Sequence, residues 1–242
     1  MIELPTHGMV LAAGLGLRMR PITENLPKPL VPLAGRTLLD RALDHLQAVE
    51  VTSATVNLHY LGQMIEDNLA TREKPKITYS WESDLLLETG GGVSAALPTL
   101  GKNPFYVVNA DIAWEDGSNP ALSRLADFWR DDAMDALLLL HPVAQATGYD
   151  GVGDYRCDSE GLLTRRRDAP SAPFVFTGVQ LLHPRLFTGA PGGPFSLTQL
   201  YDEAEAAGRL CGVVHDGAWH HIGTPAGLVE AEKLFGSSQA VD

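Results

Sequence analysis

A short segment near the start of the chain combines glycine and arginine in a pattern suited to holding an anion. Gly14 and Gly16 follow directly on the apolar run 9–13, which is typical of a buried strand. Because glycine has no Cβ, it lets the backbone turn sharply and approach a ligand closely. Arg18 and Arg20 then add permanent positive charge. The segment therefore predicts a loop that binds a nucleotide phosphate at the end of the first strand.

A carboxylate at the end of a second apolar run is suited to holding a divalent cation. The run 105–109 is strongly β-forming, and Asp111 follows two residues beyond its end. A charged carboxylate beside a buried apolar strand is unfavourable unless it binds a partner. Mg²⁺ is a suitable partner, because it prefers carboxylates, phosphate oxygens and retained waters. Asp111 is therefore our candidate metal ligand. Asn109 points to the same face of the strand and is a candidate to bind the second substrate.

Strand-like and helix-like segments alternate through the first half of the chain. The spacing of apolar residues predicts these elements in turn: a helix over 38–46, a strand over 54–58, a helix over 61–69, a strand over 77–80, a Gly-rich turn over 89–92 and a short helix over 93–97. Such alternation predicts an α/β fold with a mostly parallel sheet and right-handed crossovers. Ligands of such sheets bind beyond the carboxyl ends of the strands, where the loop 14–20, the turn 88–92 and Asp111 should meet.

The second half of the chain has a less regular pattern. It predicts a strand over 136–140, a loop over 148–153, strands over 174–176 and 179–182 on either side of Thr177-Gly178, a helix over 197–207, a strand over 210–215, a helix over 225–235 that Thr224 caps, and a frayed tail over 236–242. No linker or repeat separates the halves, so we expect one domain over residues 1–242. Residues 1–115 should bind the nucleotide, and residues 116–242 the second substrate.

Composition excludes several classes of protein. The 242 residues are 45% hydrophobic and 20% charged, as in a globular protein. The net charge of −12 argues against nucleic acid or an anionic membrane as a partner. Cys157 and Cys211 have no CxxC spacing, so neither a zinc site nor a disulfide framework is indicated. The polar, proline-interrupted start does not resemble a signal peptide, and no apolar run is long enough to span a bilayer, so we expect a cytoplasmic protein.

Two common nucleotide-binding motifs do not fit the loop. Met19 stands where the dinucleotide fingerprint GxGxxG needs its third glycine. No Gly-Lys-Ser/Thr follows the loop as a Walker motif requires, since Lys28 comes ten residues after Arg18. These departures disfavour a dehydrogenase and a P-loop enzyme. The chain also offers no convincing Ser-His-Asp or Cys-His set for nucleophilic catalysis.

The longer segment LAAGLGLRMRPITENLPKPLVPLAG, residues 11–35, resembles the signature of the sugar-phosphate nucleotidyltransferases, also called nucleotide-sugar pyrophosphorylases. Further similar segments follow in the family's order: HYLGQMIEDNL (59–69), LETGGGV (87–93), VNAD (108–111), FTGVQLLHP (176–184) and WHHIGTP (219–225). The resemblance covers most of the chain. It implies a Rossmann-like, mostly parallel sheet flanked by helices, of the GT-A-like type, with a smaller sugar-binding subregion.

The resemblance implies that a nucleoside triphosphate and a sugar 1-phosphate react to give a nucleotide sugar and pyrophosphate, with Mg²⁺ or Mn²⁺ as cofactor. The short chain and the segments LETGGG and FTGVQLLHP look most similar to the family members that couple UTP to N-acetylmuramate 1-phosphate in cell-wall sugar recycling. Mannose 1-phosphate with GTP, and glucose 1-phosphate with dTTP or UTP, remain alternatives. So does a non-catalytic, nucleotide-sensing homologue. The sequence does not indicate the oligomeric state.

The resemblance also implies roles for individual residues. Arg18, Lys28 and Asp111 would be catalytic: Arg18 and Lys28 neutralise phosphate charge, and Asp111 holds the metal. The nucleotide would be bound by Ala13, Gly14, Gly16, Leu17, Arg18, Lys28, Thr89 and Gly90. The acceptor sugar would be bound by Asn109, Gly151, Gly153, Asp154, Asp168 and Thr177. The basic run 165–167 is either a solvated surface or a contact to the sugar phosphate.

One position departs from the family's pattern. The family's W-x-D-x-G-T is here Trp219 to Thr224, with His221 where a metal-binding aspartate is expected. Imidazole is a poor ligand for Mg²⁺ and a better one for Mn²⁺ or Zn²⁺. Four interpretations stay open: Asp111 holds the metal with phosphates and water alone, His221 binds a softer ion, His221 lies near the metal without binding it, or His221 is an ordinary core or surface histidine.

Overall fold

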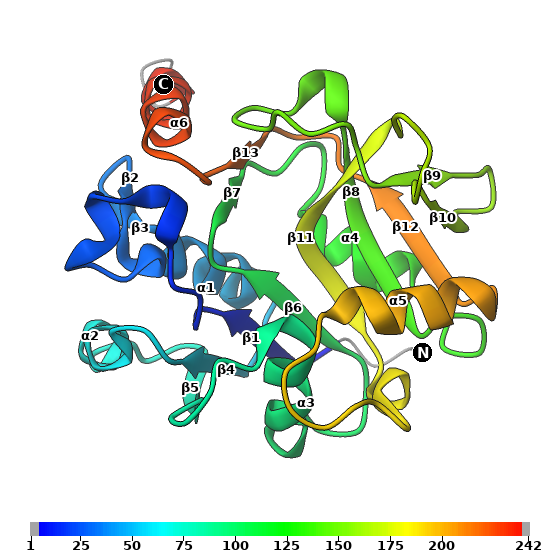
Figure 1. Cartoon of the computed structure of the whole chain (residues 1–242), viewed down its shortest axis with the longest axis horizontal. Coiled ribbons are helices and arrows are strands. Elements are labelled where there is room, and N and C mark those ends of the chain that lie inside the picture. Colours follow the sequence, from blue (N-terminus) through cyan, green and yellow to red (C-terminus); the bar gives the residue numbers. More distant parts are fainter. Residues whose placement is uncertain (1–4, 239–242) are drawn as a thin grey trace.

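The computed structural model describes residues 5–238 and is built around one large sheet flanked by helices (Figure 1). Within those residues, nine strands form this sheet, in the order β10-β9-β11-β6-β1-β4-β5, with β8 pairing β11 and β12 pairing β8. The strands are β1 (His7–Leu11), β4 (Ser53–Leu58), β5 (Lys76–Trp81), β6 (Phe105–Asn109), β8 (Ala136–Pro142), β9 (Tyr155–Cys157), β10 (Leu163–Arg165), β11 (Phe174–Leu182) and β12 (Leu210–Val214).

The sheet is mostly parallel, as the sequence predicts. Strands β1, β4, β5 and β6 pair in parallel with one another. Strand β11 pairs antiparallel with β6, β8 and β9, and β10 pairs antiparallel with β9, so only β10 and β11 run against the other strands. The one sheet extends through both halves of the chain, and the carboxyl ends of β1, β4, β5 and β6 lie along the same edge.

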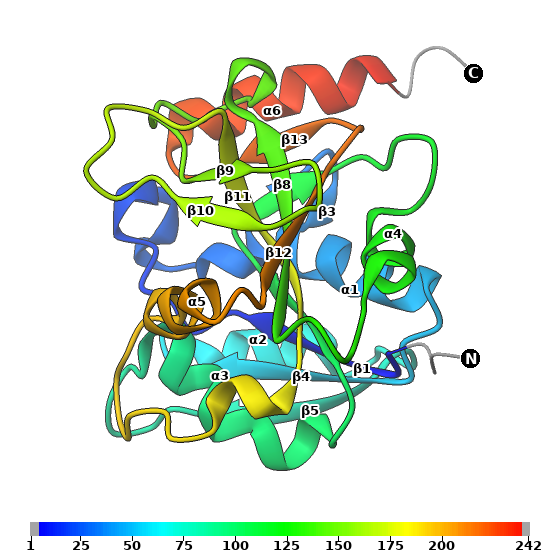
Figure 2. The same ribbon diagram turned by 90° about the vertical axis from the view of Figure 1, so that its right-hand side faces the viewer.

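The α-helices of the described part of the chain are α1 (Leu38–Ala48), α2 (Gly62–Leu69), α3 (Glu88–Leu100), α4 (Ala121–Phe128), α5 (Leu197–Ala206) and α6 (Pro225–Ser238). Successive side chains of a strand point to opposite faces. In β1, Val10 accordingly joins the core formed with α1 and α4, whereas Met9 joins the core formed with α3 and α5 (Figure 2). Within residues 5–238, no helix is long and apolar enough to cross a membrane.

A third, smaller core joins the segment after β1 to the C-terminal helix. Met19, Val31 and Leu33 pack with Ile222 and with residues of α6. The strands β7 (Ile112–Trp114) and β13 (Trp219–His221) form an antiparallel ribbon beside this core, and β2 (Pro32–Leu33) pairs with β3 (Arg36–Thr37). Met19 is fully buried. The residue that breaks the dinucleotide fingerprint is therefore an apolar anchor for the glycine loop.

The structure corrects the expected turn over 89–92, since these residues form the first turns of α3, which begins at Glu88. Glycine lowers helix propensity, which is why the sequence pattern favoured a turn. Here, tertiary packing requires glycine: a Cβ on Gly90 would lie 2.3 Å from the Phe195 ring, and one on Gly91 would lie 2.4 Å from the Gly193 carbonyl oxygen. The helix thus packs closely against the segment that leads into α5.

Two further expectations need correction. The strands predicted over 174–176 and 179–182 are one strand, β11, whose register with β8 shifts between Phe176 and Gln180. The tail expected to fray from residue 236 instead continues α6 to Ser238, and residues 239–242 lie outside the described part of the chain. The other predicted helices and strands are confirmed within a few residues of their expected ends.

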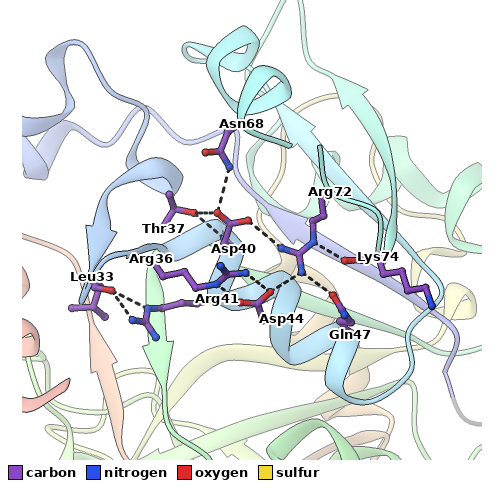
Figure 3. A network of polar contacts seen from close by, with 10 residues as sticks. All are labelled: Leu33, Arg36, Thr37, Asp40, Arg41, Asp44, Gln47, Asn68, Arg72 and Lys74. Carbon is purple, nitrogen blue, oxygen red and sulfur yellow. Dashed lines mark hydrogen bonds and ion pairs between the residues drawn. The ribbon is translucent and has the colours of Figure 1, made fainter. Parts of the chain in front are cut away.

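A network of ion pairs fixes α1 against the segment that follows α2 (Figure 3). The Arg72 guanidinium, whose side chain is only 9% exposed, donates to Asp40 at 3.1 Å and to Asp44 at 2.8 Å. Its Nε donates to the Lys74 carbonyl at 2.8 Å. Arg36 also pairs with Asp44, so one carboxylate serves two arginines. This network holds α1 against the segment that leads into the amino end of β5.

Candidate active site

The glycine loop after β1 is shaped to surround an anion. Gly16 has a φ of 63°, a left-handed conformation that disfavours residues with a Cβ. Its carbonyl accepts hydrogen bonds from the Thr23 hydroxyl at 2.7 Å and from the Met19 amide at 2.9 Å, which close the loop. The backbone N–H groups of residues 13–16 have no acceptor among the described residues. Successive free amides of this kind form a concave site for phosphate oxygens.

A cleft of about 520 Å³ lies under this loop, and we call it the main cleft. Residues 11–19 form one wall, and the ends of β1 and β6 form the floor. The other lining residues are Lys28, Pro29, Asn57, Leu86, Glu88, Thr89, Asn109, Ala110, Asp111 and Gly223. Of the residues expected to bind the nucleotide, only Gly90 is absent from this lining, because it is buried and its N–H donates to the Phe195 carbonyl at 2.8 Å.

An ion pair between Lys28 and Asp111 lies in the main cleft. Lys28 Nζ is 3.0 Å from Asp111 Oδ2, and the side chains are 10% and 35% exposed respectively. Burial alone would raise the pKa of Asp111, but the charge and hydrogen bond of Lys28, with smaller contributions from His221 and Arg18, outweigh burial and lower that pKa. Asp111 is therefore a carboxylate at neutral pH, and Oδ1 has no hydrogen-bond partner among the described residues.

Short, well-anchored segments hold both members of this pair. Lys28 begins a single 3₁₀ turn, Lys28–Leu30, between Pro27 and Pro29, whose rings fix the backbone on both sides. Asp111 connects β6 to β7, and its carbonyl accepts from the Ile222 N–H at 3.1 Å. The two side chains thus meet in the main cleft from segments far apart in the sequence.

Arg18 contributes a cation that the protein leaves unpaired. It is exposed, lines the main cleft and makes no side-chain hydrogen bond or ion pair with the described residues. Its charge nevertheless helps to lower the pKa of Asp111. A guanidinium free at the mouth of a cleft is suited to bind two phosphate oxygens at once.

His221 lies beside the carboxylate but has few companions that could bind a metal with it. The register of β13 on β7 pairs His221 with Ile112, the residue after Asp111. Burial lowers the pKa of the imidazole more than the nearby Asp111 charge raises it, so the ring is neutral at neutral pH. Among residues 5–238, no three His, Cys, Asp or Glu side chains group together as a metal site.

A second pocket of about 310 Å³, the side pocket, adjoins the main cleft, since Thr89 and Asn109 line both. Its other walls come from the β9–β10 hairpin, β11 and α5, which lie side by side in Figure 2. The lining residues beyond the shared two are Asp154, Tyr155, Arg165, Arg166, Arg167, Phe176, Gln180, Ser196, Leu197, Thr198 and Tyr201. The sequence analysis assigned no role to Gln180, which lies within the segment 176–184, or to Tyr201, and both side chains are uncharged.

The structure brings Asn109 and Asp154 to the side pocket but not the other four residues expected to bind the sugar. Thr177 is fully buried, and its hydroxyl donates to the Leu139 carbonyl at 2.8 Å and accepts from the Val179 N–H at 3.2 Å. Gly153 has a φ of 84°, and a Cβ there would lie 2.1 Å from the Ala172 carbonyl oxygen. Gly151 and Asp168 are exposed outside both pockets. Thr177 and Gly153 therefore shape the backbone of their segments.

A buried pair missed by sequence reasoning supports the main cleft from below. Asn57 Oδ1 accepts from the Ala12 N–H, and its Nδ2 donates to Glu82 Oε1, both at 2.7 Å. Glu82 Oε2 accepts from the Leu87 N–H, also at 2.7 Å, so the pair ties the start of the glycine loop to the start of α3. A Cβ on Gly92 would lie 2.9 Å from Glu82, which explains glycine there. The only sequence signal was two polar residues at strand ends.

Residues 7–173 match the sequence family of the nucleotidyl transferases, which is well over half of the 242 residues. The chain belongs to this family. It is 40% identical over 236 residues to the N-acetylmuramate alpha-1-phosphate uridylyltransferase of Caulobacter vibrioides, covering 96% of this chain and 98% of that protein. It is 32% identical over 232 residues to the enzyme of the same name from Neisseria meningitidis serogroup B, covering 95% and 98%.

Solved structures agree with this family of folds. A UDP-glucose pyrophosphorylase complexed with UDP-glucose superposes with a TM-score of 0.79 over 98% of this chain and 100% of that chain, at 19% identity. At this low identity, the structural similarity supports a common fold and nothing more. Membership of the sugar-phosphate nucleotidyltransferases, expected from residues 11–35, is confirmed, as is the expectation of an enzyme of that class. The α/β fold of the nucleotidyl transferases is confirmed too.

Proposed function

We propose that this nucleotidyl transferase couples UTP to N-acetylmuramate 1-phosphate, giving UDP-N-acetylmuramate and pyrophosphate, as a step in the reuse of cell-wall sugars. The observation that carries the proposal is the pair of adjoining pockets. The main cleft has a phosphate-binding loop and the Lys28–Asp111 pair, and the side pocket opens from it at Thr89 and Asn109. The two relatives described above carry the name of this activity, and each aligns with this chain over nearly its whole length. They support the choice of substrates.

The chemistry requires placement and charge neutralisation more than acid or base catalysis. The second pKa of a phosphate monoester is about 6, so the attacking sugar phosphate is already a dianion at neutral pH. One of its oxygens forms a bond to the α-phosphorus of UTP, and the bond from that phosphorus to the β-phosphate oxygen breaks. Pyrophosphate leaves with the electron pair. In-line placement and stabilisation of the spreading negative charge therefore determine the rate.

The residues of the main cleft are arranged for these tasks. We assign the free amides of residues 13–16 and the unpaired Arg18 to the triphosphate, where Arg18 stabilises the departing pyrophosphate. Lys28 contacts the α-phosphate, since its ammonium is fixed between two walls of the cleft. Thr89 lies at the base-binding side, and Asn109 at the junction with the sugar. Residues 1–115 thus bind the nucleotide, and residues 116–242 supply most of the sugar pocket.

The donor set fits a divalent cation held largely by substrate oxygens. Asp111 offers one unpartnered carboxylate oxygen to the cleft, and Mg²⁺ commonly binds one or two carboxylates together with substrate phosphates and water. When bound, the cation neutralises phosphate charge in the transition state. If the neutral His221 imidazole is also a ligand, Mn²⁺ should support activity better than Mg²⁺. His221→Asp should then shift the preference toward Mg²⁺, and an unchanged Mn²⁺-to-Mg²⁺ rate ratio would remove His221 from the ligand set.

The direct test measures pyrophosphate release over a panel of five nucleoside triphosphates and several sugar 1-phosphates. We expect the highest kcat/KM with UTP and N-acetylmuramate 1-phosphate, and Asp111→Asn should abolish most of that signal. Higher values with GTP and mannose 1-phosphate, or with dTTP or UTP and glucose 1-phosphate, would replace the proposed substrates. Nucleotide binding without pyrophosphate release from any pair would instead indicate a nucleotide-sensing homologue.

A further inference from the structure

One arginine of the side pocket differs from its neighbours in how its charge is balanced. Arg165 pairs with Asp202 at 2.8 Å, and Arg167 pairs with Asp202 at 3.4 Å and with Glu205 at 3.0 Å. These ion pairs join the β9–β10 hairpin to α5. They leave the charges of Arg165 and Arg167 committed to carboxylates of the protein.

Arg166 is held only by uncharged groups. Its Nε donates to the Gly153 carbonyl at 2.8 Å, and its Nη1 donates to the carbonyls of Ala169 at 2.7 Å and Arg167 at 3.2 Å. Three carbonyls fix the position of the guanidinium without neutralising it, and Nη2 has no partner among the described residues. The side pocket therefore has an oriented, uncompensated cation in its wall.

Two other side chains indicate a pocket built for a polar ligand. Gln180 is fully buried, its Oε1 accepts from the Tyr201 hydroxyl, and its Nε2 has no acceptor among the described residues. Asp154 Oδ2 accepts from the Phe176 N–H at 2.9 Å, which leaves Oδ1 for a sugar hydroxyl. Asp154 and Arg166 line the same pocket, yet no ion pair within 4.0 Å joins them, so Arg166 keeps its charge for a ligand.

The location of Arg166 indicates which part of the substrate it faces. Lys28 and Asp111 line the main cleft and not the side pocket, whereas Arg166 lines the side pocket and not the main cleft. The reacting phosphate belongs beside Lys28 and Asp111. A cation in the wall of the sugar pocket therefore calls for a second anionic group, carried by the sugar ring itself.

We propose that Arg166 binds a carboxylate carried by the sugar ring and thereby selects acidic sugar 1-phosphates as acceptors. This rests on the proposed function and deepens it. N-acetylmuramate carries on O3 a lactyl ether that ends in a carboxylate, whereas N-acetylglucosamine, glucose and mannose carry a hydroxyl group at that position. A guanidinium binds a carboxylate through two parallel hydrogen bonds, and charge-assisted hydrogen bonds of this kind are about twice as strong as neutral ones.

The test changes the charge on both sides of the contact. We compare wild-type enzyme and Arg166→Gln with two acceptors: N-acetylmuramate 1-phosphate and its analogue whose lactyl carboxylate is replaced by the isosteric carboxamide. The wild-type enzyme should prefer the carboxylate by about 10- to 100-fold in kcat/KM, mostly through KM. Arg166→Gln should lose that preference. Arg156→Gln is the matched control, because Arg156 is exposed on β9 of the same hairpin and lines neither pocket, and it should keep the wild-type ratio.

Each possible result either supports or overturns the proposed role of Arg166. A wild-type enzyme that uses both acceptors equally overturns the proposal, whatever the variants do. An equal loss with both acceptors in Arg166→Gln would mean that Arg166 contacts the shared phosphate or only supports the loop, which also overturns it. If Arg166→Gln does not fold, Arg166→Lys keeps the charge without the bidentate geometry, and its ratio should lie below that of the wild type. No product with either acceptor would mean that the proposed function, not the carboxylate contact, has failed.

Discussion

Replacing Asp111 by asparagine removes one negative charge from the main cleft and leaves the side chain almost unchanged in shape. The carboxylate lies 3.0 Å from Lys28 Nζ. At an effective dielectric constant of about 20, opposite unit charges at this distance attract each other by about 5–6 kcal/mol before desolvation is counted. Because Asp111 is 35% exposed, the net loss of stability should be smaller, about 1–3 kcal/mol.

The effect on catalysis should exceed the effect on stability. Asparagine cannot supply the anionic oxygen that the proposed cation requires, and it leaves the Lys28 ammonium without its carboxylate. Loss of one preorganised electrostatic group costs about 3–4 kcal/mol of transition-state stabilisation. Since 1.36 kcal/mol corresponds to a tenfold change in rate, kcat/KM should fall by about 10²- to 10³-fold.

The assay is the initial rate of pyrophosphate release with UTP and N-acetylmuramate 1-phosphate, combined with urea unfolding of the same preparations. Asp132→Asn is the matched control, because Asp132 is exposed in the segment between α4 and β8, away from both pockets, and it should leave the rate unchanged. A folded Asp111→Asn enzyme with a kcat/KM within tenfold of the wild-type value would refute the metal and charge assignment.

Three other predictions address the loop, the acid stability and the ion-pair network. Arg18→Ala should lower kcat/KM by about 10²-fold, and Arg18→Lys should lower it by less. A decrease of threefold or smaller in the steady-state rates of Arg18→Ala would exclude a role of Arg18 in binding the phosphates of the transition state. Burial lowers the pKa of His215, and the nearby His141 lowers it further, whereas the Ala218 carbonyl and Asp116 raise it by less. On acidification, the unfolded chain therefore binds a proton at His215 before the folded protein does. The free energy of unfolding should therefore fall as pH drops below about 6.5, less steeply in His215→Gln, and parallel urea-midpoint curves for the two proteins would contradict this. Arg72→Met should destabilise the fold by about 2–4 kcal/mol in urea unfolding, because it leaves Asp40 and Asp44 short of a buried partner, and a change below 0.5 kcal/mol would show that the network contributes little.

The regular elements could be predicted because their apolar residues repeat with a clear period. The sequences of helix α1 and of strands β4 and β6 each show a continuous apolar pattern, and the structure contains these elements at the predicted positions. The ribbon of β7 and β13 could not be predicted, since each strand has three residues and its partner lies about a hundred positions away. The start of α3 was predicted as a turn, because its glycines are explained only by tertiary contacts, with Phe195, Gly193 and Glu82.

The structure brings together the predicted site residues whose local chemistry is unusual, whereas the positions of others depend on tertiary contacts that the sequence does not reveal. Arg18, Lys28 and Asp111 are charged residues beside glycine, proline or a strand end, and the structure brings them to one cleft. Thr177 is an ordinary polar residue whose hydroxyl is taken up by Leu139 on the neighbouring strand, which no local pattern reveals. Glu82 and Arg166 gain their roles from partners in other segments, Asn57 and the Gly153 carbonyl.

The most direct test of the central claim is a crystal structure of the enzyme with its proposed product, UDP-N-acetylmuramate. We expect the diphosphate under residues 13–18 and beside Lys28, the uracil against Thr89, and the sugar in the side pocket with its carboxylate on Arg166. A nucleotide bound outside the main cleft, or a sugar directed away from the side pocket, would contradict it.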